Sequence, residues 1–173
     1  MSQVKEIELK DLPVNPFEMI GKDWMLVTAK KGDQVNTMTA SWGGMGVLWG
    51  SDVVFVFIRQ SRFTKEFIDA ADHFSLSFLP ESEKKAMGYL GRTSGRDEDK
   101  IAKVGYEVLM DGDTPYFAQA ETTLICRKLS RHFLGQEGMI DEEIVPKWYA
   151  GADAENYHDL YVAKIEKVLV KED

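Results

Sequence analysis

Residues 34–65, QVNTMTASWGGMGVLWGSDVVFVFIRQSRFTK, contain the pattern around which the rest of the chain is organised. A polar, hydroxyl-rich segment at 36–42 predicts one strand, and a glycine-rich segment at 43–52 predicts a loop. The apolar run 53–58 is too short for a typical helix and is rich in valine and phenylalanine, which favours a buried central strand. The stretch ends in a cluster of cations that no acidic residue interrupts.

The segments on either side extend this pattern into a set of strands. Residues 22–31 alternate as a strand, and the turn Lys31-Gly32-Asp33 lets the strand at 36–42 pair back on them as a hairpin. Residues 73–79 alternate between apolar side chains and serines, which predicts a half-buried strand. The remaining elements are expected as strands at 118–134 and 158–170 and as short helices at 65–71, 82–90 and 97–104.

Three segments are predicted to lack regular structure. Prolines and a glycine in residues 1–22 predict an irregular arm, above all at 1–16. Residues 111–115 are interpreted as a polar link, and residues 135–157 as a glycine-rich, acidic insertion between two strands.

The order of these elements predicts the fold class. Strands outnumber helices, and no alternation of strands and helices is sustained, so a parallel sheet is disfavoured. A mainly β, antiparallel sheet closed into a small barrel, with a few short peripheral helices, fits better. The 173 residues are expected to form a single domain.

Composition excludes several classes of function. The net charge of −8 argues against nucleic acid or an anionic membrane as the main partner. A single cysteine rules out an intramolecular disulfide, and no apolar run approaches the ~18 residues of a membrane span, so a cytoplasmic protein is expected. His73, His132 and His158 lack metal-ligand spacing, so no metal site is expected.

The cation cluster mixes positive charges with hydroxyls in an acidic protein. It consists of Arg59, Ser61, Arg62, Thr64 and Lys65, with Thr64 placed as the N-cap of the helix at 65–71. A helix N-terminus beside arginines favours a phosphate group. On the residues alone, a phosphate site and a solvated strand-to-helix turn remain about equally supported.

The glycine-rich segment matches no nucleotide fingerprint. After Gly44 and Gly46, Trp49 stands where G-x-G-x-x-G needs a third glycine, and no Gly-Lys-Ser/Thr follows as in a P-loop. The segment is therefore interpreted as a bend between barrel strands. The small, hydroxylated residues 37–42 could admit a flat ligand to the main chain, or could form an ordinary polar edge strand.

Several motifs in order resemble a known family. NTMTASWGG, IRQSRFTKEFI and FSLSFLP, followed by SGRDEDK, AETTLICR and YHDLYVAKIEKV, are similar to the flavin reductase-like proteins, and to flavoredoxin in particular. The resemblance covers roughly residues 17–170. It implies an FMN-binding split β-barrel with Greek-key topology, usually a homodimer with the flavin near the subunit interface.

The resemblance also implies where the cofactor lies. Residues 39–42 would follow the flavin ring and ribityl chain, the cation cluster would take the 5′-phosphate, and the loop at 94–96 would close over the ligand. The full set of implied FMN-binding residues is Asn36, Thr37, Met38, Thr39, Ala40, Ser41, Trp42, Arg59, Ser61, Arg62, Thr64, Lys65, Ser94, Gly95, Arg96 and His158.

The function implied is that of an FMN-dependent oxidoreductase. It would act either as a flavin reductase with NADH or NADPH as electron donor, or as a flavoredoxin that exchanges electrons with a redox-protein partner. No catalytic side chain is expected, because the cofactor carries the chemistry. The alternatives are a non-catalytic module that stores or senses FMN, and a small barrel that binds another phosphorylated ligand or haem.

Overall fold

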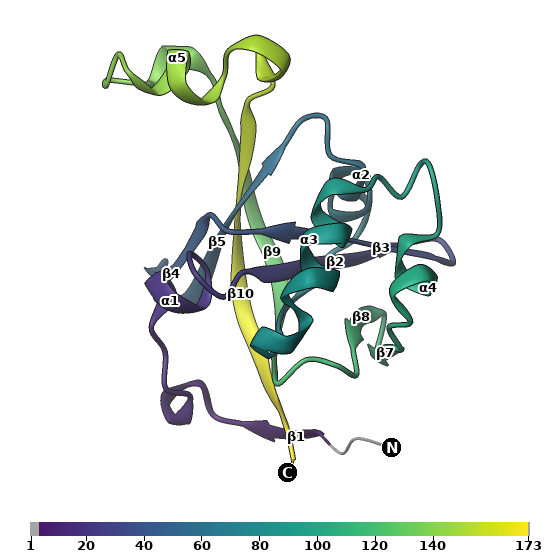
Figure 1. The fold of residues 1–173 in the computed structure, drawn as a ribbon. Coiled ribbons are helices and arrows are strands. Elements are labelled where there is room, and N and C mark those ends of the chain that lie inside the picture. Colours follow the sequence, from purple (N-terminus) through teal and green to yellow (C-terminus); the bar gives the residue numbers. More distant parts are fainter. Residues whose placement is uncertain (1–3, 173) are drawn as a thin grey trace.

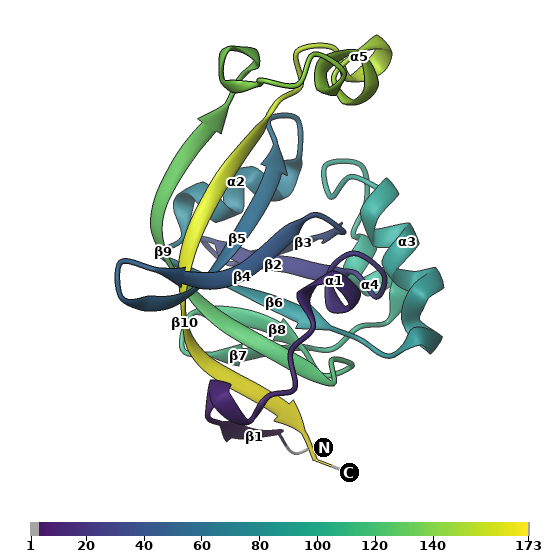
Figure 2. The ribbon, with the colours of Figure 1, turned by 90° about the vertical axis from the view of Figure 1, so that its left-hand side faces the viewer.

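The computed structural model describes residues 4–172, and its main feature is one antiparallel sheet curled into a split barrel (Figures 1 and 2). The strands follow the order β3-β2-β6-β9-β10-β5-β4, with β1 added beside β10. Their bounds are β1 Val4–Ile7, β2 Met25–Lys31, β3 Gln34–Ala40, β4 Gly43–Leu48, β5 Ser51–Arg59, β6 His73–Phe78, β9 Thr122–Leu134 and β10 His158–Lys171. The mainly β fold class expected from the sequence is confirmed.

Short helices decorate this sheet, and a small hairpin lies beside it. The helices are α1 Pro16–Met19, α2 Phe63–Ala70, α3 Lys84–Arg92, α4 Lys100–Val104 and α5 Ile144–Trp148, and the hairpin strands are β7 Val108–Asp111 and β8 Thr114–Phe117. Helix α2 packs against β2 and β3, and α3 packs against β3. No helix within residues 4–172 is long and apolar enough to cross a membrane.

The core lies between the sheet and these helices. Val54, Val56 and Ile58 of β5 are fully buried together with Tyr161 and Ala163 of the neighbouring β10. The run 53–58 is thus a buried strand, as its composition predicts.

The expectation of a half-buried strand at 73–79 is wrong, because β6 is buried on both faces. Its serines lie under the β7–β8 hairpin and beside β9, where each finds a hydrogen-bond partner. The Ser75 hydroxyl donates to the Pro115 carbonyl at 2.6 Å, and the Ser77 hydroxyl lies 3.3 Å from that of Thr123. Buried hydroxyls are tolerated when they are bonded in this way.

The glycine-rich segment is not a loop. It forms β4, which pairs antiparallel with β5 from Gly43 opposite Val56 onward. Trp49 and Gly50 both have left-handed φ angles, 51° and 67°, which suits the two-residue turn that joins the strands. A Cβ on Gly43 would lie 2.9 Å from the Phe55 carbonyl oxygen, so glycine there permits close strand pairing.

Other irregular segments are also more ordered than predicted. In the N-terminal arm, β1 pairs with the end of β10, and α1 follows; residues 1–3 of the predicted arm lie outside the described part of the chain. The polar link 111–115 contains the turn of the β7–β8 hairpin. Residues 135–157 hold α5 and short 3-10 turns at the far end of β9 and β10 (Figures 1 and 2).

Candidate functional site

Two adjoining cavities lie where β3, β5 and the start of α2 meet. The first, called here the strand cavity, has a volume of about 190 Å³ and is lined by Met38, Thr39, Ala40, Ser41, Trp42, Phe57, Arg59, Arg62 and His158. The second, the helix cavity, has a volume of about 170 Å³ and is lined by Asn36, Ser61, Arg62, Phe63, Thr64, Arg92, Thr93, Ser94, Gly95 and Lys100. Arg62 borders both, so the two cavities form one elongated site.

The end of β3 forms one wall of the strand cavity. The Thr39 hydroxyl is used inside the protein, because it donates to the Met87 carbonyl of α3 at 2.6 Å. Thr37 points away from the cavities and shares a buried hydrogen bond of 2.8 Å with Thr28. What this wall offers a ligand is therefore mainly the backbone of residues 40–42 and the Trp42 ring.

Arg62 is held at the centre of the site. It is the N-cap residue of α2, and its Nη1 donates to the Gly91 carbonyl at 2.8 Å. Burial, together with the nearby charge of Arg59, lowers the pKa of Arg62 from its usual value. No carboxylate among residues 4–172 lies within ion-pair distance of its guanidinium.

Thr64 is not the N-cap, because α2 begins at Phe63, two residues earlier than predicted. Thr64 is buried inside the first turn, and its hydroxyl oxygen accepts a hydrogen bond of 2.9 Å from the Asn36 amide. This bond ties β3 to α2 at the wall of the helix cavity.

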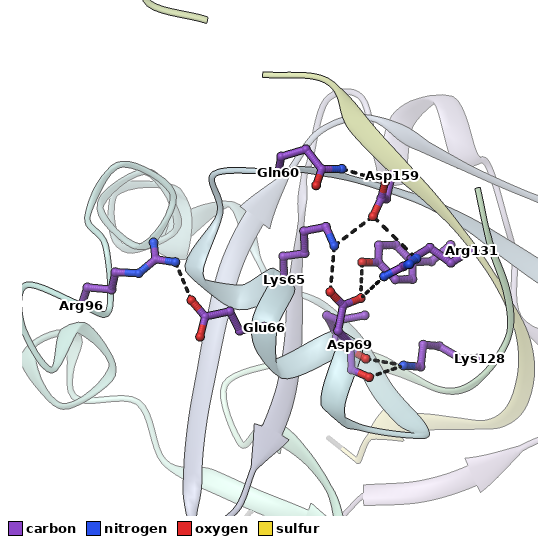
Figure 3. Close-up of polar contacts among 10 residues, drawn as sticks. Gln60, Lys65, Glu66, Asp69, Arg96, Lys128, Arg131 and Asp159 are labelled. Atoms are coloured by element: carbon purple, nitrogen blue, oxygen red, sulfur yellow. Dashed lines mark hydrogen bonds and ion pairs between the residues drawn. The ribbon is translucent and has the colours of Figure 1, made fainter. Parts of the chain in front are cut away.

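Lys65 lies outside both cavities. Its ammonium is 2.7 Å from the Asp69 carboxylate and 2.9 Å from the buried carboxylate of Asp159 on β10 (Figure 3). Although burial acts to lower it, these hydrogen bonds raise the pKa of Lys65. Gln60 and Arg131 also contact Asp159, which completes a network on the side of α2 that faces β10.

Arg59 borders the strand cavity but is held by the 135–157 segment. Its guanidinium donates to the carbonyls of Asn156 at 3.1 Å and Trp148 at 3.2 Å, and lies 3.5 Å from Asp153. The Asn156 side chain also bonds Ser61 twice, accepting from its backbone N–H and donating to its hydroxyl at 2.8 Å. The Ser61 hydroxyl hydrogen remains available to donate.

The loop after α3 forms the opposite wall of the helix cavity. A Cβ on Gly95 would lie 2.3 Å from the Asn36 amide oxygen, so a larger residue there would displace the Asn36 side chain that bonds Thr64. The Ser94 hydroxyl accepts from the Arg96 backbone N–H at 3.2 Å. The Arg96 side chain lies outside the cavity, where it pairs with Glu66 at 2.6 Å (Figure 3).

His158 and two aromatic rings close the far end of the strand cavity. His158 Nδ1 lies 2.7 Å from the Tyr149 hydroxyl, and its ring is 5.2 Å from the Trp42 ring. Burial, reinforced by the Arg59 charge, lowers the pKa of His158 to about 4, so its imidazole is neutral at pH 7. Trp148 packs edge-on against Trp42, with 4.9 Å between the ring centroids.

Lys100 is a site residue that the sequence analysis missed. It is only 3% exposed, and its ammonium donates to the carbonyls of Leu90 at 2.7 Å and Thr93 at 2.8 Å. Burial and the charge of Arg62 lower its pKa to about 8. It is the last residue of the SGRDEDK motif, from which only Ser94, Gly95 and Arg96 were expected at the site, and it is the first residue of the five-residue helix α4.

A third cavity, the aromatic cavity, adjoins the strand cavity and has a volume of about 630 Å³. The two share Ser41, Trp42, Phe57 and His158, and no residue that lines the aromatic cavity carries a formal charge at neutral pH. Within residues 4–172, no group of three or more histidine, cysteine or acidic side chains could hold a metal ion.

Comparison with known structures identifies the fold. The FMN-binding domain of a flavin reductases-like enzyme from Shewanella baltica superposes with a TM-score of 0.69 at 18% identity, covering 98% of this chain and 78% of that one. Flavoredoxin from Desulfovibrio vulgaris gives a TM-score of 0.66 at 20% identity, covering 86% and 69% of the two chains. At these identities the likeness establishes the split-barrel fold.

Two sequence comparisons add the family. The high molecular weight rubredoxin of Moorella thermoacetica is 35% identical over 94 residues, which is 54% of this chain and 40% of that protein. The chain thus matches less than half the length of that relative. The model of the flavin reductase like domain matches residues 19–173, nearly the whole chain. The protein therefore belongs to the flavin reductase-like family.

Proposed function

We propose that the protein is a single-domain, FMN-dependent oxidoreductase. The phosphate of FMN would lie in the helix cavity, and the ring system would lie along residues 39–42 in the strand cavity. The observation that carries this proposal is the position of Arg62, a partly buried cation that borders both cavities and has no carboxylate of residues 4–172 within ion-pair distance. A partly buried charge without a counter-charge is destabilising, which favours an anionic ligand.

The other residues of the site fit the same ligand. Hydroxyls of Ser61 and Ser94 accept hydrogen bonds from protein N–H groups, which leaves their hydrogens for phosphate oxygens. Because residue 95 is glycine, the loop after α3 lies close to the Asn36 side chain at the wall of the helix cavity. Of the cations expected at the phosphate, Arg62 fits best, whereas Lys65 is already neutralised.

The chain's own side chains position and shield the ring. Trp42 and the backbone of residues 40–42 would hold its edge, and the neutral His158 would add no charge beside it. Bound FMN supplies the redox chemistry by accepting a hydride or single electrons and passing them on. The uncharged aromatic cavity next to Trp42 would admit the group that exchanges electrons with the ring.

The electron donor is NADH, NADPH or a redox protein. One structural relative is an NADH:FAD oxidoreductase from Streptomyces globisporus, and others are flavoredoxins. The sequence relative from Moorella is a rubredoxin-type protein, which supports a redox-protein partner as the second choice. We further propose a cytoplasmic homodimer.

The absorption spectrum of the purified protein, before and after addition of FMN, tests cofactor binding. Two visible flavin bands are expected, and anaerobic NADH or NADPH should bleach them. A protein that stays colourless and does not bind FMN contradicts the proposal. A flavin that binds but is bleached by neither nicotinamide nor a reduced redox protein indicates a storage or sensing module.

Replacing Arg62 tests the placement of the phosphate. Arg62→Ala should weaken FMN binding by about 1.5–3 kcal/mol, because it removes a charge-assisted hydrogen bond. The matched control is Arg127→Ala, an exposed arginine paired with Glu166 that lines none of the three cavities, and it should leave the affinity unchanged. Equal affinities for both variants, measured by quenching of flavin fluorescence, would place the phosphate elsewhere.

A further inference from the structure

The aromatic cavity has the size and the lining of a small-molecule site. Its volume of about 630 Å³ lies in the range of such sites, which are mostly apolar with a few polar groups. Apolar side chains from four elements line it, namely Phe17 of α1, Met45 of β4, Phe57 of β5 and Leu134 of β9. The lining side chains that can form hydrogen bonds are those of Ser41, Trp42, Tyr149 and His158.

The charges around this cavity disfavour an anionic ligand. The segment 135–157, which supplies Tyr149 to the cavity, contains six acidic residues and one lysine. The Arg59 guanidinium lies 5.2 Å from the centre of the Tyr149 ring, but the Trp148 carbonyl and the Asp153 carboxylate are among its partners. Since no lining residue is charged at neutral pH, an anion would lose its hydration here without gaining a counter-charge, which is costly.

His158 presents a neutral hydrogen-bond donor beside this apolar space. Its Nδ1 lies 2.7 Å from the Tyr149 hydroxyl, and burial raises the pKa of Tyr149, so the phenol keeps its proton and donates it to Nδ1. With Nδ1 as the acceptor, the hydrogen of the neutral ring is on Nε2. Within residues 4–172 Nε2 has no hydrogen-bond partner, and the Tyr89 hydroxyl is the one fully buried side-chain atom left without one, so Nε2 faces open space.

We propose that the aromatic cavity binds an uncharged, planar quinone whose carbonyl oxygen accepts a hydrogen bond from His158 Nε2, and that Tyr149 is a positioning residue that fixes the donating tautomer of His158. The quinone ring is flat and apolar, and its carbonyl oxygens accept hydrogen bonds without carrying a charge. The rings of Trp42, Phe57 and Tyr149 provide apolar walls for it.

The role of the quinone as a substrate rests on the proposed function, whereas its binding does not. Reduction of a quinone to the hydroquinone consumes two electrons and two protons. The electrons would come from reduced FMN, which is thereby oxidised, and the protons from solvent, so that both carbonyl groups become hydroxyls.

The first test compares an uncharged and an anionic quinone in the wild type, saturated with oxidised FMN and without a reductant. Menadione is an uncharged naphthoquinone, and lawsone carries in place of its methyl group a hydroxyl that is ionised at pH 7. Binding is followed by the NMR shift of the Trp42 indole N–H, which reports on this cavity. Menadione should bind at least about tenfold more tightly than lawsone, because the cavity provides no counter-charge.

The second test removes the donor and uses methylnaphthalene, which has no carbonyl groups, as the reference ligand. His158→Phe should weaken menadione binding about 2- to 10-fold relative to methylnaphthalene, the effect of one neutral hydrogen bond. His158→Gln, whose amide N–H can donate, should recover part of this loss. The matched control is His132→Phe, an exposed histidine that lines none of the three cavities, and it should bind both ligands as the wild type does.

The role of Tyr149 has its own spectroscopic signature. In the wild type, the ring nitrogen resonances of His158 should show one tautomer with the hydrogen on Nε2. In Tyr149→Phe they should show a mixture of tautomers, and menadione should bind more weakly. Unchanged nitrogen resonances would show that Tyr149 does not position His158.

The outcomes separate this inference from the function proposed above. If the protein binds FMN but menadione leaves the Trp42 resonance unchanged, or lawsone binds as tightly as menadione, the quinone site is wrong and the FMN protein remains. If menadione binds as predicted but the protein does not bind FMN, the cavity is a quinone site and the proposed function is wrong.

Discussion

Lys65 and Lys100 are both buried lysines beside the same helix N-terminus, yet their surroundings are opposite. Lys65 lies between two carboxylates, Asp69 and Asp159, and its pKa is raised. Lys100 lies beside Arg62 with only carbonyls as partners, and its pKa is lowered. The difference shows that a buried cation indicates a ligand site only after its counter-charges within the protein have been counted.

Removing the Asp159 carboxylate from the Lys65 network should change the free energy of unfolding more than the other substitutions below. Asp159→Asn removes a buried charge and leaves Lys65 with one carboxylate, so the free energy of unfolding should fall by about 3 kcal/mol. Urea denaturation followed by circular dichroism measures the change. A loss below about 1 kcal/mol would mean that the network adds little to stability.

In flavin-free protein, the pH dependence of the free energy of unfolding should distinguish the two lysines, with an effect of intermediate size. A lowered pKa for Lys100 means that the unfolded chain binds more protons between pH 8 and about 10, so its contribution to stability increases with pH. The slope is at most about 1.4 kcal/mol per pH unit. Lys65, whose pKa is raised, stays protonated in both states from pH 8 to pH 9 and contributes no slope there.

Urea midpoints at pH 8 and pH 9 measure this effect. The wild type should gain stability relative to Lys100→Met over that interval. If the two proteins show the same pH dependence, Lys100 carries no lowered pKa in the empty site.

The smallest change in stability is expected for the exposed ion pairs of Glu166. Glu166 pairs with Arg127 at 2.7 Å and with His73 at 3.0 Å near the surface. Glu166→Gln should lower the free energy of unfolding by less than about 1 kcal/mol, because solvent screens exposed pairs. If Glu166→Gln lowers the free energy of unfolding as much as Asp159→Asn does, burial does not explain the difference in strength between the two networks.

Much of the fold follows from local pattern. Alternation and turn chemistry predict the hairpin β2–β3 and the long strands β9 and β10. Strand β4 is missed because its glycines suggest a loop, while its order comes from pairing with β5. Strand β1 is missed for the same reason, since its partner is the opposite end of the chain.

The candidate site is only partly predictable for a related reason. The sequence brings Arg59, Arg62 and Lys65 close together, but their partners come from distant segments. Asp159 on β10 neutralises Lys65, and the 135–157 segment occupies Arg59. Of these three cations, only Arg62 keeps its charge free for a ligand, and Lys100, the last residue of the SGRDEDK motif, lines the same cavity.

Phosphate binding in the helix cavity is tested by the ratio of the dissociation constants of the wild type for riboflavin and FMN at pH 7, measured by quenching of flavin fluorescence. The two ligands differ only by the phosphate that Arg62 would bind. We predict that FMN binds at least about 10-fold more tightly, which corresponds to one charge-assisted hydrogen bond. Equal affinities would contradict the assignment of the helix cavity beside Arg62 as a phosphate site.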